Sequence, residues 1–295
     1  MDLNIKDLCK TYPSGVKAID SFNLKIGKGM FGLLGPNGAG KSSLMRTIAT
    51  LQDPDTGSIR FGEIDVLKDP MSLRKILGYL PQDFGVYPKM NAEELLDYFA
   101  VLKGVAAKKD RNKIVEYVLE LTNLSDARKK HVSNYSGGMK QRFGIAQLLL
   151  NNPKLIIVDE PTAGLDPAER NRFLNVLRDI ASSNTIIFST HIVDDIKDLC
   201  NDMAIMDHGK LLKQTSPSAS IKEHTGKIFT CKIDQSELKE METKYFVISS
   251  KFNADNSLLI RVFANERPTE KFAHSEPVLE DTYFIALRNA NLKQI

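Results

Sequence analysis

Apolar positions along the chain follow two different periods, and their order predicts a layered fold of strands and helices. In LNIKDL and FNLKI, within the first 30 residues, apolar and polar side chains roughly alternate on either side of a polar turn at residues 13–15. Alternation of this kind is typical of strands with one exposed face. Three later runs, MFGLL, LIIV and TIIF, are almost wholly apolar, which is typical of strands covered on both faces in a parallel sheet.

Helical patterns fill the intervals between these runs. SSLMRTIATL follows the first apolar run, and Asn91 with Glu94 three residues later forms a capping-box start for a helix that ends near Gly104. Residues 110–122 carry apolar positions on one face, a further helix follows Ser136, and DPAE places an acid and a proline at helix-start positions. Buried strands that alternate with helices predict a doubly wound α/β core.

The last quarter of the chain has a different pattern, with a polar segment followed by short apolar runs. QTSPSAS, at residues 214–220, is a polar segment with proline and serine, and it predicts a joint between two units. KIFTCKI, YFVISS and SLLIRVF then indicate short strands, and residues 279–289 indicate a final helix. We therefore expect a main domain at residues 1–215 and a small α+β accessory domain at residues 216–295.

Composition is that of a folded globular chain: 42% of the residues are hydrophobic, 26% are charged, and the net charge is +3. Two basic clusters, at residues 108–113 and 128–130, lie among acids on predicted helical faces. A solvated face explains them better than a nucleic-acid footprint, and no nucleic-acid partner is expected. Cys9, Cys200 and Cys231 are far apart in the sequence, which indicates free thiols in a reducing compartment.

The N-terminal MDLNIKDLCK is charged and has no apolar core of a signal peptide. No apolar run approaches the roughly 18 residues that a membrane-spanning helix requires. We therefore expect a cytoplasmic protein. If it serves a membrane process, another protein must cross the bilayer.

A phosphate-binding motif follows the first apolar run. Residues 35–42 read GPNGAGKS and match GxxxxGK[ST], with a predicted strand before the motif and a predicted helix after it. Backbone N–H groups of such a loop point at phosphate oxygens, backed by the positive end of the helix. Lys41 is expected to reach the β- and γ-phosphates and Ser42 to bind Mg²⁺. The motif predicts a site for a nucleoside triphosphate, with contacts from Asn37, Gly38, Ala39, Gly40, Lys41, Ser42 and Ser43.

Two adjacent acids end the apolar run LIIV. We expect Asp159 to bind Mg²⁺, through water, and Glu160 to face the γ-phosphate and accept a proton from the attacking water. General-base catalysis of this kind contributes roughly 10²- to 10⁴-fold in rate. The alternative is an ordinary strand end with two solvated acids.

The segment YSGGMKQR, at residues 135–142, places two glycines directly after a serine cap, which suits a close approach to phosphate better than a helix interior. On this segment and the two preceding motifs the sequence resembles the ABC ATPase family, whose signature is most often LSGGQ. Ser136, Gly137 and Gly138 are kept, whereas Tyr135 and Met139 depart from that pattern.

The resemblance covers about residues 1–215 and assigns roles to four further positions. Gln82, in LPQDFG, resembles the glutamine that contacts Mg²⁺ and the attacking water, and His191 resembles the histidine that contacts the γ-phosphate. Tyr12 resembles the aromatic residue that stacks on adenine, and Asp166 the aspartate that links the two sites of a dimer. The implied fold is a P-loop NTPase core with ABC-type antiparallel β and α-helical subdomains, the helical one at about residues 84–150.

The resemblance also implies partners. Ser136 and Gly138 would contact the ATP bound by the opposite subunit of a head-to-tail dimer, either a homodimer or a pseudo-symmetric heterodimer. A separate polytopic membrane subunit would hold the protein at the inner face of the cell membrane. The expected docking surface lies between Gln82 and Ser136, although a place in the helix core is equally compatible with each of its apolar residues: Phe84, Val86, Tyr87, Leu95, Tyr98 and Phe99.

The C-terminal stretch EPVLEDTYF resembles the PxLEDxF-like ending of exporter ATPase subunits, with one extra residue between Asp281 and Phe284. It favours export, and an amphipathic helix that closes a small domain is the alternative. Two other functional classes remain as alternatives: an ABC-type ATPase that acts on ribosomes or DNA, and a nucleotide-sensing regulator. The chain shows one phosphate loop and no long coiled-coil insertion, against the first, and it has Glu160, against the second.

Overall fold

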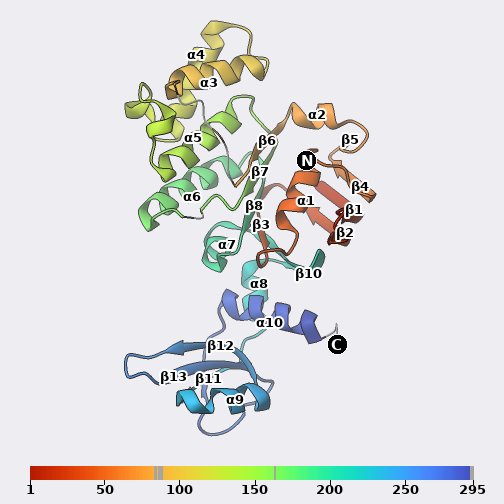
Figure 1. Cartoon of the computed structure of the whole chain (residues 1–295), viewed down its shortest axis with the longest axis vertical. Coiled ribbons are helices and arrows are strands. Elements are labelled where there is room, and N and C mark those ends of the chain that lie inside the picture. The colour runs from red at the N-terminus through yellow and green to blue at the C-terminus, as the bar shows by residue number, and fades with distance from the viewer. Residues whose placement is uncertain (83–84, 86–88, 163, 293–295) are drawn as a thin grey trace.

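A six-stranded, mostly parallel sheet forms the centre of the computed structural model, which describes residues 1–82, 85, 89–162 and 164–292 (Figure 1). The strand order is β10-β9-β3-β8-β7-β6, and only β10 runs antiparallel to its neighbour. The predicted α/β core is therefore confirmed. The strands are β3 (Gly29–Leu34), β6 (Leu77–Leu80), β7 (Leu155–Asp159), β8 (Thr185–Thr190), β9 (Asp202–Asp207) and β10 (Lys210–Thr215).

The apolar runs are explained by helices on both faces of this sheet. Every residue of β7 and β8 is buried. Ile157 and Ile187 belong to the hydrophobic cluster beside α1 (Lys41–Ile48), whereas Ile156 and Ile186 belong to the cluster beside α6 (Pro167–Ala181) and α7 (Val193–Leu199). Successive side chains of a strand point to opposite faces, so a doubly covered strand has no polar face.

A second sheet, antiparallel, packs over α1 with the order β2-β1-β4-β5. It accounts for the alternating N-terminal segments, because one of its faces is exposed. A short helix, α2 (Pro70–Arg74), follows it and is capped by Asp69. The strands are β1 (Leu3–Thr11), β2 (Lys17–Ile26), β4 (Thr56–Phe61) and β5 (Ile64–Asp65).

A helical layer with its own hydrophobic cluster lies beyond the β6 edge of the central sheet (Figure 1). The predicted capping box is present at its first helix: Glu94 N donates to Asn91 Oδ1 at 3.0 Å, and Asn91 N donates to Glu94 Oε2 at 3.2 Å. The elements are α3 (Ala92–Leu102), α4 (Lys108–Leu121), the 3₁₀ turns Ser125–Ala127 and Val132–Asn134, and α5 (Gly137–Leu149).

The C-terminal quarter forms a third sheet, antiparallel, with the order β12-β13-β11-β14. The polar segment at residues 214–220 is more ordered than a simple joint, because α8 (Pro217–Lys222) begins within it and the Ser216 hydroxyl accepts a hydrogen bond from Ala219 N at 3.2 Å. The remaining elements are β11 (Ile228–Ile233), the 3₁₀ turn Gln235–Glu237, α9 (Leu238–Lys244), β12 (Phe246–Phe252), β13 (Leu258–Phe263), β14 (Ala273–His274) and α10 (Leu279–Leu292).

Helix α10 is a layer between the C-terminal sheet and the central sheet (Figure 1). Leu279 and Tyr283 are buried in the same cluster as β3, β8, α6 and α7. Toward the C-terminal sheet, Asp281 pairs with Arg261 through both carboxylate oxygens, at 2.8 and 2.6 Å, and the Arg288 guanidinium lies 4.4 Å from the Phe246 ring centroid. One helix therefore packs in the core beside the central sheet and is bonded to the C-terminal sheet through Asp281 and Arg288.

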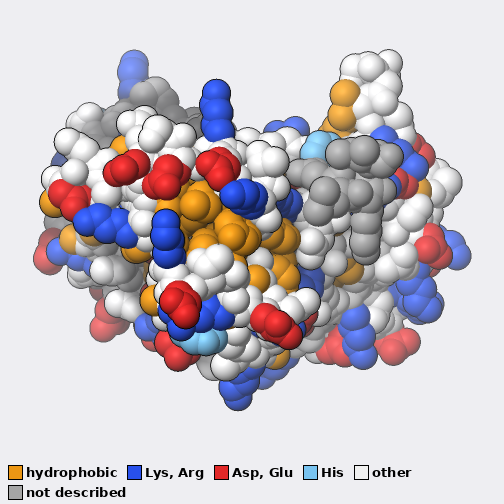
Figure 2. Space-filling view, turned by 90° about the horizontal axis from the view of Figure 1, so that it is seen from below, with side chains coloured by type: hydrophobic (Ala, Val, Ile, Leu, Met, Phe, Trp, Pro, Cys, Tyr) orange, Lys and Arg blue, Asp and Glu red, His pale blue; other side chains and the backbone are white. Residues whose placement is uncertain are grey.

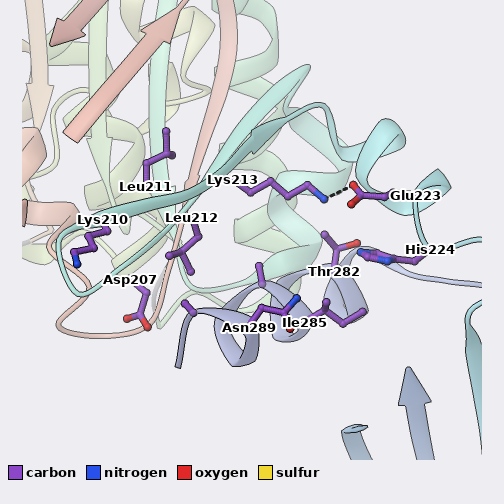
Figure 3. A pocket seen from close by; sticks show the side chains of 12 residues that line it. Asp207, Lys210, Leu211, Leu212, Lys213, Glu223, His224, Thr282, Ile285 and Asn289 are labelled. Carbon is purple, nitrogen blue, oxygen red and sulfur yellow. Dashed lines mark hydrogen bonds and ion pairs between the residues drawn. The ribbon is translucent and has the colours of Figure 1, made fainter. Parts of the chain in front are cut away.

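Two cavities flank this C-terminal unit. One of about 490 Å³ lies between β10, α8 and α10, where Leu212 and Ile285 line it and an ion pair joins Lys213 to Glu223 (Figure 3). On the face seen from below, hydrophobic side chains show between charged ones (Figure 2). A second cavity, beside α9 and β11, is lined by Ile233, Met241, Tyr245 and Phe272 together with lysines and glutamates.

Within the described residues, no helix combines the length and the apolar character that crossing a bilayer requires.

Replacing Asp281 with alanine should lower the apparent free energy of unfolding by about 3 kcal/mol, because Arg261 would keep a partly buried charge without its partner. The Asp281 side chain is 2% exposed. Urea denaturation followed by circular dichroism measures the effect. Asp255→Ala is the control, since the Lys232–Asp255 pair lies in solvent with both side chains more than half exposed and its loss should leave the midpoint nearly unchanged. Equal effects of the two variants would contradict the assignment of α10 as a shared layer.

Candidate functional site

The phosphate loop connects the carboxyl end of β3 to the start of α1. Gly40 has a φ of +102°, and a Cβ at this position would lie 2.2 Å from the carbonyl oxygen of Ala18. Only glycine fits both the left-handed backbone and the close approach of β2. The loop is therefore held against β2 and opens toward solvent at the carboxyl edge of the sheet, where α/β proteins bind ligands.

Lys41 is the buried cation of this loop, with 4% of its side chain exposed. Its ammonium donates to the carbonyl oxygens of Gly35 at 2.8 Å and Pro36 at 3.1 Å, and it lies 3.1 Å from Glu160 Oε1. A buried ammonium is tolerated only when acceptors surround it. The loop carbonyls and one acid from another strand satisfy this requirement.

The two acids at the end of β7 point in different directions. Asp159 is buried and accepts a hydrogen bond from the Ser189 hydroxyl at 2.6 Å. Glu160 has a φ of +45°, and its N–H donates to Ser189 Oγ at 3.0 Å. This left-handed turn, costly for a residue other than glycine, aims the Glu160 carboxylate at Lys41.

Glu160 also meets the end of the neighbouring strand. Its Oε2 lies 3.2 Å from Nδ1 of His191, whose side chain is 46% exposed. One carboxylate thus bridges the phosphate-loop lysine and the histidine that follows β8. The structure brings together three residues that the sequence analysis selected from separate segments of the chain.

A cleft of about 660 Å³ surrounds the phosphate loop. All seven of the loop and helix-start residues selected from the sequence line it, and Tyr12, Gln82 and Glu160 join them. The Tyr12 hydroxyl donates to Gln52 Oε1 at 3.0 Å and lies 3.0 Å from Ser43 Oγ, so its ring is anchored to α1. The loop and helix-start residues are Asn37, Gly38, Ala39, Gly40, Lys41, Ser42 and Ser43.

His208 also lines this cleft, although the sequence analysis gave it no role. It lies at the tip of the β9–β10 hairpin, and Gly209 N there donates to Ala39 O in the phosphate loop at 2.9 Å. Its Nδ1 pairs with Asp207 at 2.9 Å. Only the position of the hairpin reveals this residue, because nothing in the local sequence distinguishes it from an exposed histidine.

Ser136 and Gly138 are not among the residues that line the cleft. Ser136 caps α5 by accepting from Met139 N at 3.2 Å, and it is exposed, whereas Gly138 is buried against α6. Tyr135, the departure from the common signature, is buried in the helical layer and donates to Ala127 O at 2.9 Å. Burial raises the pKa of Tyr135 to about 12. The tyrosine at this position of the signature is therefore a core residue of the helical layer.

Asp166 caps α6, with its Oδ1 accepting from Glu169 N at 2.9 Å. Arg170, which follows Glu169, pairs with the buried Asp195 at 2.6 Å. Asp195 also accepts a hydrogen bond from the Thr162 hydroxyl at 2.9 Å. The segment between Glu160 and α6 is thereby tied to α7. Sequence reasoning missed Asp195, which is an acid with 0% exposure in the first turn of a helix.

The expected docking residues do not all reach the surface. Leu95 is fully buried in the helical layer, so the expectation that it contacts a partner is wrong: α3 turns this face toward α4 and α5. Phe99 is partly buried against the same cluster, and Tyr98 is 42% exposed. Phe84, Val86 and Tyr87 lie outside the described residues.

Oxygen donors dominate the site, which suits a hard divalent cation. Ser42 supplies a hydroxyl in the cleft, whereas Asp159 is not among the residues that line it and uses one carboxylate oxygen for Ser189. No cluster of three or more His, Cys, Asp or Glu side chains forms a metal site of its own in the part of the chain that the structure describes. A cation here would therefore share its ligands with a bound phosphate.

Comparisons with known proteins agree with this geometry. The family model described as ABC transporter matches residues 19–163. The uncharacterized ABC transporter ATP-binding protein YxlF of Bacillus subtilis is 32% identical over 296 residues, which cover 95% of this chain and 98% of that protein. The linearmycin resistance ATP-binding protein LnrL of Bacillus subtilis is 36% identical over 198 residues, which cover 67% of this chain and 63% of that protein.

A solved structure shows the same fold. CbiO1 from Clostridium perfringens, described as part of the ABC transporter complex cbiONQ, superposes with a TM-score of 0.69 and 29% identity, over 75% of this chain and 90% of CbiO1. The near-complete overlap with YxlF extends the match through the C-terminal sheet. The chain belongs to the ABC transporter family, as one of its ATP-binding and ATP-hydrolysing subunits.

Proposed function

We propose that the phosphate-loop cleft binds ATP with Mg²⁺ and hydrolyses it through Glu160. The observation that carries this proposal is the single carboxylate between Lys41 and His191, at 3.1 and 3.2 Å. A triphosphate offers Lys41 stronger acceptors than Glu160 does. When Lys41 turns to the phosphates, the Glu160 carboxylate becomes free to accept a proton from water.

The other site residues bind and orient the nucleotide. The loop N–H groups and Lys41 would hold the β- and γ-phosphates, His191 would contact the γ-phosphate, and Tyr12 would stack on adenine, a contact worth about 1–3 kcal/mol for base–aromatic stacking. Ser42, Asp159 and Gln82 would hold Mg²⁺, which neutralises phosphate charge when bound. Glu160 is held for its task by the bond from its N–H to Ser189.

ABC ATPase cassettes act as dimers, and the placement of Ser136 and Gly138 supports a head-to-tail arrangement for this chain. Both residues belong to the start of α5 and neither lines the chain's own cleft. Helix N-termini bind anions, so each signature turn would close over the triphosphate of the other subunit. Two copies of this chain, or this chain with a close relative, satisfy the geometry equally well.

A groove at the helical layer supports docking of a membrane subunit. It has a volume of about 650 Å³ and a mixed lining: apolar side chains come from α4, α6, the turn after α3 and the end of α5, and Lys75, Lys103 and Asp179 line it as well. Val101, Leu102 and Tyr117 near it are 47%, 65% and 60% exposed. We place the membrane subunit here, which would hold the protein at the cytoplasmic face of the membrane. The apolar lining residues are Val105, Ile114, Tyr117, Leu121, Leu149, Leu150, Pro153 and Ile180.

We further propose that the transporter is an exporter. LnrL is named for resistance to linearmycin, and resistance requires that a toxic compound leave the cell or be kept from its target. The C-terminal motif supports the same branch, because it resembles the ending of exporter ATPase subunits; its Leu279 packs in the ATPase core and its Asp281 pairs with Arg261. Recovery of a polytopic membrane protein with the native chain tests the role in transport against the alternatives, and co-purification of ribosomes or DNA instead would contradict that role.

Glu160→Gln should lower the rate of ATP hydrolysis by roughly 10²- to 10⁴-fold, since the amide cannot accept the proton. The amide oxygen can still accept from Lys41, so ATP binding should persist and an ATP-dependent dimer should accumulate. Phosphate release and size-exclusion chromatography with light scattering measure the two effects. Glu63→Gln, at an exposed turn, is the matched control and should behave as the unmodified protein. Full turnover by Glu160→Gln would refute the base assignment.

Tyr117→Glu should abolish recovery of the chain with the membrane fraction while leaving the ATPase rate of the purified chain unchanged. The substitution places a charge among the apolar side chains of the groove, where a docking partner would have to desolvate it. Phe252→Glu is the control, because Phe252 is 58% exposed on β12, in the C-terminal sheet. If only Phe252→Glu released the chain from membranes, the docking surface would belong to the C-terminal unit.

A further inference from the structure

The signature turn, residues 136–138 at the start of α5, packs on the first turn of α6. The contact is between Gly138 and Glu169, and the sequence analysis did not anticipate it. A Cβ on Gly138 would lie 2.3 Å from Glu169 Oε2 and 2.7 Å from Glu169 Cδ. The φ of Gly138 lies outside the left-handed region, so its backbone conformation is open to other residues. What requires glycine here is space: the Glu169 carboxyl occupies the volume that any side chain at position 138 would fill.

Two arginines hold that carboxyl in place. Arg142 lies one turn further along α5, only 6% exposed, and its guanidinium pairs with Glu169 Oε2. Arg172 pairs with Glu169 Oε1 at 2.7 Å from the solvent side. One carboxylate between two guanidinium groups leaves the base of the signature turn positively charged, which favours an anion at the nearby start of α5.

Glu169 also belongs to the segment that leads back to the catalytic acid. Its own N–H donates to Asp166 Oδ1 at 2.9 Å, and Arg170 beside it pairs with Asp195 at 2.6 Å. Asp195 holds Thr162, two residues after Glu160. A shift of Glu169 would therefore move the start of α5 and the start of α6 together.

We propose that Glu169 is a positioning residue, which sets the distance between the signature turn and α6 and so the fit of Ser136 onto the nucleotide of the opposite subunit. This inference rests on the dimer proposed above. The hydrophobic face of α6, with Phe173 and Leu177, lies in the core cluster and does not include Glu169. Loss of the carboxylate should therefore weaken closure of the dimer and keep the fold, at a cost in stability because Arg142 would retain a buried charge without this partner.

A double-mutant cycle with Gly138→Ala and Glu169→Ala tests the contact. We expect Gly138→Ala to lower kcat/KM for ATP about tenfold or more, because its Cβ pushes the Glu169 carboxyl away from Arg142. Glu169→Ala should raise the KM for ATP about fivefold and change kcat less than about twofold. The double variant should match Glu169→Ala alone, since without the carboxyl an alanine at position 138 has room. Additive losses, or an active Gly138→Ala, would overturn the proposal.

A binding experiment separates positioning from structural damage. In the Glu160→Gln background, Glu169→Gln keeps the side-chain shape and removes the charge that both arginines share. The ATP concentration needed for half-maximal dimerisation should rise about fivefold, while binding of a fluorescent ATP analogue to the monomer should change less than about twofold. Glu242→Gln, on the exposed side of α9, is the control and should alter neither quantity. Thermal unfolding confirms that each variant is folded.

These results distinguish the inference from the proposed function. If Glu160→Gln with intact Glu169 does not dimerise with ATP, the dimer itself is wrong. If it dimerises and Glu169→Gln leaves the ATP dependence unchanged, only the positioning role is refuted.

Discussion

A buried ammonium at the end of the phosphate loop is the constraint on which the site depends. Lys41 has 4% of its side chain exposed, so its charge must be satisfied within the protein. Two of its acceptors, Gly35 O and Pro36 O, come from its own loop, and the third comes from Glu160 at the end of β7. Loop, strand and acid must therefore meet at one edge of the sheet, and the parallel order of β3, β8 and β7 brings them there.

The same ammonium explains why Glu160 adopts a costly backbone. A φ of +45° is unfavourable for a glutamate, yet an ordinary strand continuation would carry its carboxylate away from Lys41. The bond from Glu160 N to Ser189 offsets part of this cost. Because Asp159 bonds to the same serine through its side chain, one hydroxyl fixes both acids. The strained turn at Glu160 thus makes the two adjacent carboxylates point in different directions.

Much of the fold follows from local patterns, and the parts that do not are set by long-range packing. The capping box of Asn91 and Glu94 and the apolar runs within β7 and β8 are visible in the sequence because neighbouring residues decide them. Leu95 shows the limit: helical periodicity identifies an apolar face but does not say whether protein or partner covers it. Likewise α10 is recognisable as a helix, whereas its return to the ATPase core depends on residues far away in the sequence.

The site shows the same division. Motifs identify Lys41, Glu160 and His191 one by one, but the contacts among them arise from strand order. His208 and Asp195 escape sequence reading because contacts between distant segments place them: Gly209 bonds the β9–β10 hairpin to the phosphate loop, and Asp195 pairs with Arg170. Asp195 is buried, and its contacts with Thr162 and Arg170 join the segment after Glu160 to α6. Glu160 and His191, which we propose face the chain's own nucleotide, follow β7 and β8, and α6 is bonded to the segment after Glu160 through Arg170 and to α5 through Glu169. In the proposed dimer, these contacts would connect the two nucleotide sites.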